Sequence, residues 1–198
     1  MKVGVLALQG NIPEHLGALG ALLPPGDLLP VRYPSELERV EAIFLPGGES
    51  TTIARLLRGA GLWKPLARRL QEGLPTLATC AGLILLARTL APSPAGRDPP
   101  TFGVLDLVVR RNDYGAQRES FEGPVRIEGL KGGAFPGVFI RAPRILEVGP
   151  GAEPFAWRDA EIVGARHGTV WGTTFHPELS GDLRLHRMFL DQVRRRAR

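Results

Sequence analysis

The single cysteine of the chain, Cys80, lies in the stretch PTLATCAGLILLA, residues 75–87. An apolar, strand-like segment ends immediately before it, and a helix-like apolar segment follows. A strand–turn–helix junction of this kind exposes a nucleophile, and the small residues Ala81 and Gly82 suit its tight turn. The N–H groups at the start of the helix favour a thiolate, and that of Ala81 can donate to an oxyanion. Cys80 is therefore a candidate nucleophile, although a lone cysteine among apolar residues is usually buried and inert.

A nucleophilic cysteine needs a base, and the chain offers four histidines: His15, His167, His176 and His186. His15 and His186 lie on predicted helices and His167 lies in a turn, whereas His176 follows the predicted strand 169–175 and is followed by Pro177 and Glu178. Residues two apart in an extended segment project to the same side, so Glu178 can orient one ring nitrogen and leave the other for Cys80. These three side chains would form an acyl-transfer triad with sulfur as the nucleophile. Taken alone, His176 is better interpreted as the end of a strand followed by a surface carboxylate.

A third candidate element is LPGGEST, residues 45–51, at the end of a predicted strand. Two adjacent glycines let the backbone approach a ligand closely, and an N–H of Gly47 or Gly48 can complete an oxyanion hole with Ala81. The segment lacks the lysine and the spacing of a phosphate-binding P-loop. A Gly-Gly turn is a weak signal by itself, so its meaning depends on whether it meets the other two elements.

The first half of the chain must position these groups, and its pattern alternates between strand and helix. Strands are predicted at residues 2–8, 28–32, 41–45 and 74–79, and helices at 12–23, from 51 or 52 onwards, at 65–72 and at 81–90. Such alternation predicts a three-layer α/β fold: a mostly parallel central sheet, helices on both faces and right-handed crossovers. Ligands gather at the carboxyl ends of the strands of such a sheet, where all three candidate elements fall.

The second half of the chain is rich in strands. After a proline-rich loop at residues 91–100, strands are predicted at 102–110, 124–127, 137–140, 145–148, 161–165 and 169–175, and a helix at 181–195. An antiparallel or mixed extension of the sheet would accommodate them. No repeat or linker divides the chain, so we expect residues 1–198 to form one domain.

Composition excludes several other classes of protein. One cysteine rules out an intramolecular disulfide framework and a cysteine-rich zinc site, and it fits a reducing compartment, so we expect a cytoplasmic protein without a metal site. We expect no signal peptide at the start, because its apolar run is short, and no apolar segment reaches the roughly 20 residues that span a bilayer. The net charge of +5 would fall to +1 without the four arginines among the last five residues, so it does not indicate nucleic-acid binding.

The three elements together resemble the triad glutamine amidotransferases, and a closer resemblance covers nearly the whole chain. The blocks that resemble the glutaminase subunit of pyridoxal 5′-phosphate synthase are VGVLALQGNIPEH, FLPGGEST, ATCAGLILLA, RRNDYGAQRESFE, VFIRAP and TTFHPEL. The pairing of LALQG with PGGEST is distinctive, whereas the cysteine and His-Pro-Glu elements occur in other glutaminases. The resemblance implies a flavodoxin-like, class I glutamine amidotransferase fold.

The resemblance also implies an activity and a set of site residues. Glutamine would be hydrolysed to glutamate and ammonia through a thioester on Cys80, with His176 moving protons and Glu178 orienting His176. The glutamine-binding positions carried over are Gly47, Gly48, Glu49, Arg111, Ile140 and Arg141, and the oxyanion hole is Gly48 with Ala81. Arginine can hold the α-carboxylate bidentately and Glu49 can recognise the α-ammonium group.

Several of these assignments leave alternatives. Arg110 is the alternative to Arg111, which is preferred because it adjoins Asn112. Without the resemblance, Arg111 and Arg141 would be interpreted as solvated surface charges. Gln9 and Asn11 follow the first strand, and we expect them to contact a partner or to arrange the oxyanion hole rather than to act in catalysis.

The resemblance implies a partner, because free ammonia becomes ammonium in water and then is a poor nucleophile. The partner would be a (β/α)8-barrel synthase that makes pyridoxal 5′-phosphate from ribose 5-phosphate and glyceraldehyde 3-phosphate, in a ring of twelve synthase and twelve glutaminase subunits. No cofactor is expected on the glutaminase. We expect weak activity without the synthase, because docking would order the oxyanion hole.

Three other interpretations remain open from the sequence. The chain could be a glutaminase that serves another product, such as imidazole-glycerol-phosphate, although LALQG and GGEST argue against this. It could be an inactive α/β binding protein, which the intact set of Cys80, His176 and Glu178 disfavours. It could also be a peptidase or redox hydrolase built on the same elbow, which would act without glutamine.

Overall fold

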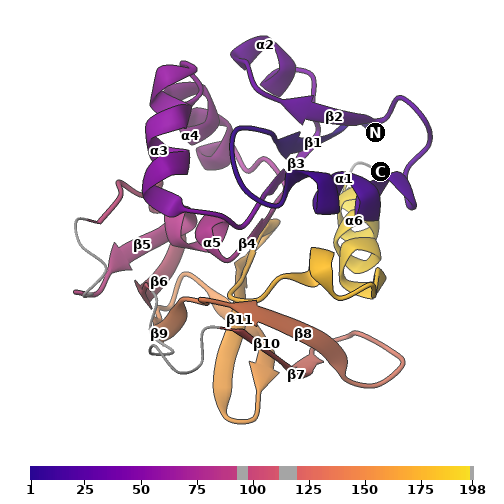
Figure 1. Ribbon diagram of the computed structural model, residues 1–198, viewed down its shortest axis with the longest axis vertical. Coiled ribbons are helices and arrows are strands. Elements are labelled where there is room, and N and C mark those ends of the chain that lie inside the picture. The colour runs from indigo at the N-terminus through magenta and orange to yellow at the C-terminus, as the bar shows by residue number, and fades with distance from the viewer. Residues whose placement is uncertain (93–97, 112–119, 197–198) are drawn as a thin grey trace.

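The computed structural model describes residues 1–92, 98–111 and 120–196, which form a layered α/β fold (Figure 1). The first half contains β1 Val3–Leu6, α1 Ile12–Gly20, β2 Leu28–Val31, α2 Pro34–Leu37, β3 Ala42–Leu45, α3 Ser50–Gly59, α4 Trp63–Gln71, β4 Thr76–Thr79 and α5 Ala81–Leu86. The second half contains β5 Ala87–Leu90, β6 Leu105–Arg110, β7 Ser120–Ile127, β8 Phe135–Ile140, β9 Arg144–Val148, β10 Glu153–Arg158, β11 Glu161–His167, β12 Val170–Thr173, the 3₁₀ turn η1 Pro177–Leu179 and α6 Arg184–Arg196.

The described strands form one large sheet in the order β2-β1-β3-β4-β12-β11-β10-β7-β8. The first five strands of this order are parallel, and the remaining pairs are antiparallel. The order of the parallel part is that of flavodoxin-like folds, with β12 in the fifth position. The predicted mostly parallel sheet with an antiparallel extension is therefore confirmed.

The central strands are buried on both faces, which explains their continuous apolar sequences. Side chains along β3 point alternately to the two faces. Ile43 and Leu45 join the core beneath α3, α4 and α5, whereas Phe44 joins the core beneath α1 and α6. Helices lie on both faces of the parallel part, as Figure 1 shows. The sheet is therefore packed between two helical layers.

The antiparallel strands return toward the carboxyl edge of the parallel part. β8, at the far end of the strand order, pairs with β7, and its Val138 carbonyl accepts a hydrogen bond from the N–H of His176 at 2.8 Å. A smaller sheet in the order β5-β6-β9 lies beside α5 (Figure 1). The strands predicted in the second half of the chain therefore supply walls for the carboxyl edge.

The structure corrects the predicted helix at residues 81–90, which is too long. The helix ends at Leu86, and residues Ala87–Leu90 form β5, paired in parallel with β6. A short apolar run such as 81–87 has no periodicity that separates helix from strand, so tertiary pairing decides. The sequence interpretation also missed β10, whose Pro154 weakens a strand pattern, and the single turn α2.

Within the part of the chain that the structure describes, no helix is long and apolar enough to cross a membrane.

Candidate active site

Cys80 lies on a strained elbow between β4 and α5. Its backbone has φ 49° and ψ −103°, a conformation that residues other than glycine rarely adopt. Its N–H donates to the Thr173 carbonyl at 2.8 Å, which fixes the elbow to the neighbouring strand β12. A Cβ on Gly82 would lie 2.4 Å from the Leu45 carbonyl oxygen, so this tight turn requires glycine there. The thiol is 6% exposed and contacts the Ile140 carbonyl at 3.9 Å.

His176 and Glu178 form a buried pair just beyond β12. The Nδ1 atom of His176 lies 2.8 Å from Oε1 of Glu178, and both residues are less than 9% exposed. The sequence argument placed the two residues on one side of an extended segment. Glu178 instead belongs to the 3₁₀ turn η1, so the pairing arises from a turn and that part of the argument was wrong.

Electrostatics favour a charged His–Glu pair. Burial lowers the pKa of His176, but its hydrogen bonds with Cys80 and Glu178 outweigh burial and raise this pKa to about 10. Burial raises the pKa of Glu178, but the nearby His15 and the hydrogen bond with His176 lower it to about 2. An imidazolium between a sulfur and a carboxylate is therefore the stable state near neutral pH.

Gly47 lies where the glycine loop, residues 45–51, meets Cys80 and His176. A Cβ at this position would lie 2.2 Å from Cε1 of His176 and 3.2 Å from Cβ of Cys80. The Gly47 N–H donates to Oγ1 of Thr79 at 2.9 Å, which secures the loop to β4. The three elements singled out in the sequence thus meet at the carboxyl edge of the sheet.

The segment after β1 supports both the glycine loop and the triad. The Asn11 N–H donates to the Gly47 carbonyl at 3.0 Å, and the Glu49 N–H donates to Oε1 of Gln9 at 2.9 Å. The side-chain amide of Asn11 also lies 3.1 Å from Oε1 of Glu178, to which it donates. Sequence reasoning missed this contact with the triad. The position of Asn11 at the carboxyl end of a parallel strand was the available signal.

A pocket of about 170 Å³ opens beside the cysteine, smaller than typical drug-binding sites and suited to a small ligand. It is lined by Asn11, Gly48, Glu49, Ser50, Cys80, Ile84, Arg111, Ile140, Arg141 and His176. All six predicted glutamine-binding positions except Gly47 are in this lining, and Gly47 lies directly beneath it against His176. Ala81, the other oxyanion-hole candidate, is the first residue of α5.

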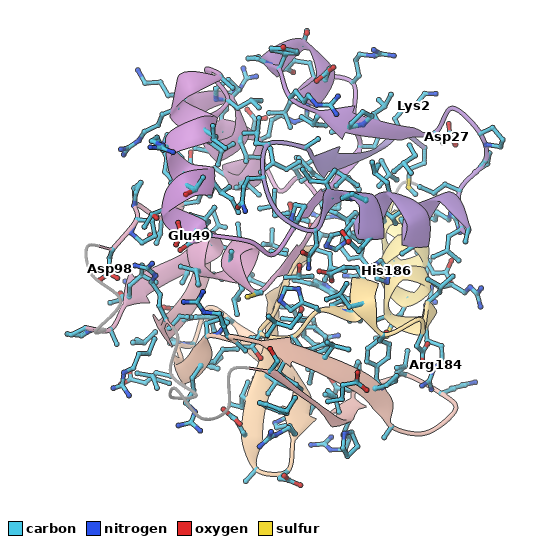
Figure 2. All side chains as sticks on the ribbon, in the orientation of Figure 1. Lys2, Asp27, Glu49, Asp98, Arg184 and His186 are labelled. Atoms are coloured by element: carbon cyan, nitrogen blue, oxygen red, sulfur yellow. The ribbon has the colours of Figure 1, made fainter. Side chains whose placement is uncertain are left out.

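Arg111 is 4% exposed, so it is not the solvated surface charge that the sequence alone would suggest. Its guanidinium lies 3.4 Å from Glu49 and 3.3 Å from Asp98, and Figure 2 shows these two acidic residues on the same side of the molecule. Arg110 belongs to β6 and is absent from the described pocket lining. Asn112, which guided the choice between them, lies outside the described residues.

Glu49 has a second task, because it caps the N-terminus of α3. Its Oε2 accepts from the Thr52 N–H at 2.8 Å and from the hydroxyl of Thr51. Burial raises the pKa of Glu49, but these hydrogen bonds and Arg111 outweigh it and keep this pKa below its usual range. Its other oxygen, Oε1, faces Arg111 at the pocket. The carboxylate is therefore anionic and fixed in orientation.

The remaining wall comes from the end of β8. Ile140 is 36% exposed, and Arg141 is exposed with a φ of 43°. This left-handed turn lets the chain leave β8 at the mouth of the pocket.

Among the described residues, no cluster of three or more His, Cys, Asp or Glu side chains could hold a metal ion.

A cysteine elbow and a His–Glu pair at the carboxyl edge of a flavodoxin-like sheet are the features of a triad glutamine amidotransferase. The chain matches the SNO glutamine amidotransferase family over residues 5–195, and it belongs to that family. A solved structure described as a glutamine amidotransferase superposes with a TM-score of 0.88 at 43% identity, covering 98% of this chain and 99% of that one.

The chain is also similar to curated relatives that share one name. The chain is 48% identical to pyridoxal 5′-phosphate synthase subunit PdxT of Streptomyces coelicolor, over 97% of this chain and 93% of the relative. It is also 48% identical to the subunit of the same name from Corynebacterium glutamicum, over 100% of this chain and 98% of the relative. The relatives therefore match along essentially their whole length.

Proposed function

We propose that this protein hydrolyses L-glutamine to L-glutamate and ammonia and delivers the ammonia to a synthase that makes pyridoxal 5′-phosphate. The observation that carries the proposal is the meeting of Cys80, His176 and Glu178 beside a small pocket that contains a buried arginine. Family membership and the PdxT relatives support the same activity. Residues 1–198 would act as one glutaminase domain in the cytoplasm.

The proposed reaction begins with the imidazolium of His176 beside the sulfur of Cys80. The thiolate attacks the side-chain carbonyl carbon of glutamine, and the N–H groups of Ala81 and Gly48 stabilise the resulting oxyanion. His176 then donates its proton to the amide nitrogen, the C–N bond breaks, and ammonia leaves a thioester. Water attacks the thioester with His176 as general base, the C–S bond breaks, and glutamate leaves. Glu178 holds the ring of His176 through both halves.

The other wall of the pocket would recognise the amino-acid end of glutamine. Arg111 suits the α-carboxylate, because a guanidinium binds a carboxylate through two parallel hydrogen bonds. Glu49 suits the α-ammonium, since its Oε1 faces the pocket while Oε2 remains on α3. Ile140 and Arg141 line the same end. In this arrangement the side-chain amide of glutamine extends toward Cys80.

The name of the PdxT relatives supports a synthase partner, because they are subunits of pyridoxal 5′-phosphate synthase. We propose that the partner is a (β/α)8-barrel subunit and that twelve copies of each protein assemble. Ammonia would then pass internally and escape protonation. Docking would also order the oxyanion hole, so the isolated subunit would be weakly active.

The decisive experiment measures ammonia release from glutamine by the wild type and by Cys80→Ala, each with and without the cognate synthase. We expect a loss of at least about 10³-fold in kcat for Cys80→Ala, in line with removal of other catalytic nucleophiles. A Cys80→Ala protein with a normal rate would refute the nucleophile. Equal wild-type rates with and without synthase would refute activation by docking. Activity on another substrate in the absence of glutamine would instead indicate a peptidase or redox hydrolase.

A further inference from the structure

His15, a buried residue of α1, lies against the carboxylate of the triad. Its side chain is fully buried, and Nε2 lies 3.5 Å from Oε2 of Glu178 and 3.3 Å from Oγ1 of Thr79. The other oxygen of Glu178, Oε1, faces His176 and Asn11. Oε2 has no hydrogen-bond partner among the described residues, and the polar group that faces it is Nε2 of His15 at 3.5 Å.

The surroundings of His15 define which of its nitrogens carries the proton. Nε2 faces two oxygen acceptors, whereas Nδ1 has no hydrogen-bond partner among the described residues. A buried N–H without an acceptor costs more than a buried lone pair without a donor, so the proton belongs on Nε2. Burial lowers the pKa of His15 more strongly than the charge of Glu178 raises it.

The contact through Thr79 extends to the glycine loop. The Thr79 hydroxyl oxygen, 3.3 Å from His15, also accepts the N–H of Gly47 at 2.9 Å. Gly47 packs against the ring of His176, since a Cβ on this glycine would lie 2.2 Å from Cε1 of the ring. One imidazole therefore joins the carboxylate of the triad to the residue that supports the glycine loop.

We propose that His15 is a positioning residue for glutamine hydrolysis, whose Nε2–H holds Oε2 of Glu178 and the Thr79 hydroxyl so that Oε1 stays turned toward His176. This inference rests on the proposed function for its reaction. His15 touches neither the pocket nor the substrate, since it acts only through Glu178 and Thr79. Its loss should therefore change the rate of the chemical step rather than the affinity for glutamine.

His186, on α6, supplies a matched control. It is as deeply buried as His15, their ring centroids lie 5.8 Å apart, and it stacks on Phe44 with centroids 5.7 Å apart. Figure 2 labels it close to α1 and α6. Neither of its nitrogens has a hydrogen-bond partner among the described residues. Replacing it with phenylalanine changes the same aromatic cluster without touching the contact to Glu178.

The test compares His15→Phe, which removes the donor, with His15→Gln, whose amide nitrogen can reach the place of Nε2. Each variant is assayed with the synthase for kcat and KM, and alone for Tm. For His15→Phe we expect kcat to fall about 3- to 10-fold, the net value of the hydrogen bond to Thr79 and the longer contact to Glu178, with KM unchanged. His15→Gln should recover most of this loss, and His186→Phe should retain wild-type kcat.

Alkylation of Cys80 by iodoacetamide, measured against pH, gives a readout that needs no glutamine. The titratable groups around His15 are Glu178, His176, His186 and Glu14. A loosely held Glu178 supports the imidazolium less well, so the midpoint of the alkylation profile should move to higher pH in His15→Phe. It should return toward wild type in His15→Gln and stay unchanged in His186→Phe.

Several results would overturn the proposal. Unchanged kcat and alkylation in His15→Phe would do so, and so would equal losses in His15→Phe and His15→Gln that follow Tm. If His15→Phe does not fold, His15→Asn replaces it, since its shorter amide cannot reach Glu178. Equal activity of the Asn and Gln variants would then refute the proposal. If wild type with synthase releases no ammonia, the proposed function fails, while the alkylation profiles still decide whether His15 positions the triad.

Discussion

The two walls of the pocket differ in how they are held. The triad wall consists of Cys80, His176 and Glu178, at the ends of the adjacent parallel strands β4 and β12. The recognition wall consists of Glu49, Arg111 and the end of β8, which come from three separate parts of the fold. In the proposed reaction, the chemistry would thus be placed at the ends of two fully buried strands. Recognition of the amino-acid end would be placed on segments around them.

The two walls also differ in the kind of polar contact that holds their residues. In the triad wall, backbone hydrogen bonds hold Cys80 and His176, and the side chain of His176 faces that of Glu178. In the recognition wall, Glu49 and Arg111 pair with each other at 3.4 Å. Bound glutamine would place its α-carboxylate against Arg111 and its α-ammonium group against Glu49. These contacts would replace the ion pair between the two side chains. Changes to the triad wall should therefore lower kcat, and changes to the recognition wall should raise KM.

Of the substitutions that test this difference between the walls, Gly47→Ala should cause the largest change, a loss in kcat. The added Cβ would lie 2.2 Å from Cε1 of His176, so the ring or the loop must move. A displacement of about 1 Å in a catalytic group can cost about 100-fold, and we expect at least that loss in kcat. Gly17→Ala is the control, because a Cβ there has nothing within 4 Å. Wild-type kcat in Gly47→Ala would show that the loop does not position His176.

Arg111→Lys should have the next largest effect, and on KM rather than kcat. A lysine keeps the charge but loses the bidentate geometry, so we expect KM for glutamine to rise about 10-fold. Arg110→Lys is the matched control, because Arg110 is not part of the described pocket lining. The opposite pattern, with Arg110→Lys raising KM, would transfer the substrate contact to Arg110.

Asn11→Ala should have a smaller effect, on kcat. The substitution removes the amide that donates to Oε1 of Glu178 at 3.1 Å, while the backbone bond from residue 11 to Gly47 remains. The net value of a hydrogen bond predicts a loss of about 3- to 10-fold in steady-state kcat. A rise in KM without a change in kcat would place Asn11 in the recognition wall instead.

The smallest effect concerns stability against pH. The depressed pKa of Glu178, about 2 against 4.5, gives stabilisation that is complete above pH 4.5 and is lost toward pH 2. The raised pKa of His176, about 10 against 6.5, gives stabilisation that is complete below pH 6.5 and is lost toward pH 10. These groups together favour the range between pH 4.5 and 6.5.

Thermal unfolding of the wild type and Glu178→Gln across pH measures this effect. The difference in Tm should be a few degrees above pH 4.5 and should shrink toward pH 2, where the wild-type carboxyl group is also protonated. At alkaline pH the difference should shrink again as His176 loses its proton. A Tm difference that is constant from pH 2 to pH 10 would contradict both pKa shifts.

Much of the site could be predicted because its signals are local. A cysteine between strand and helix, a Gly-Gly turn after a strand and a His-Pro-Glu segment are visible in short stretches, and the sheet rule places them at one edge. The contributions of Asn11, His15 and Thr79 were not visible in this way. A histidine on a helix or a threonine in a strand has many ordinary roles, and only packing gives it a particular neighbour.

The same limit explains the errors in the predicted elements. Residues 81–90 are apolar enough for helix or strand, and the pairing of β5 with β6 decided where the helix ends. Glu178 reaches His176 through a 3₁₀ turn, although an extended segment would also have placed them on one side. Local sequence limited the choices in both cases, and long-range contacts selected among them.

The sequence by itself determined the reactive groups, the alternation that builds a parallel sheet and the edge at which those groups collect. Only the tertiary structure decided that Arg111 is buried beside Glu49, that β8 returns to face the cysteine and that His15 lies against Glu178. The physical reason is range. Side-chain type and backbone preference act over a few residues, whereas burial and hydrogen bonding across 60 to 167 positions exist only once the layers have packed.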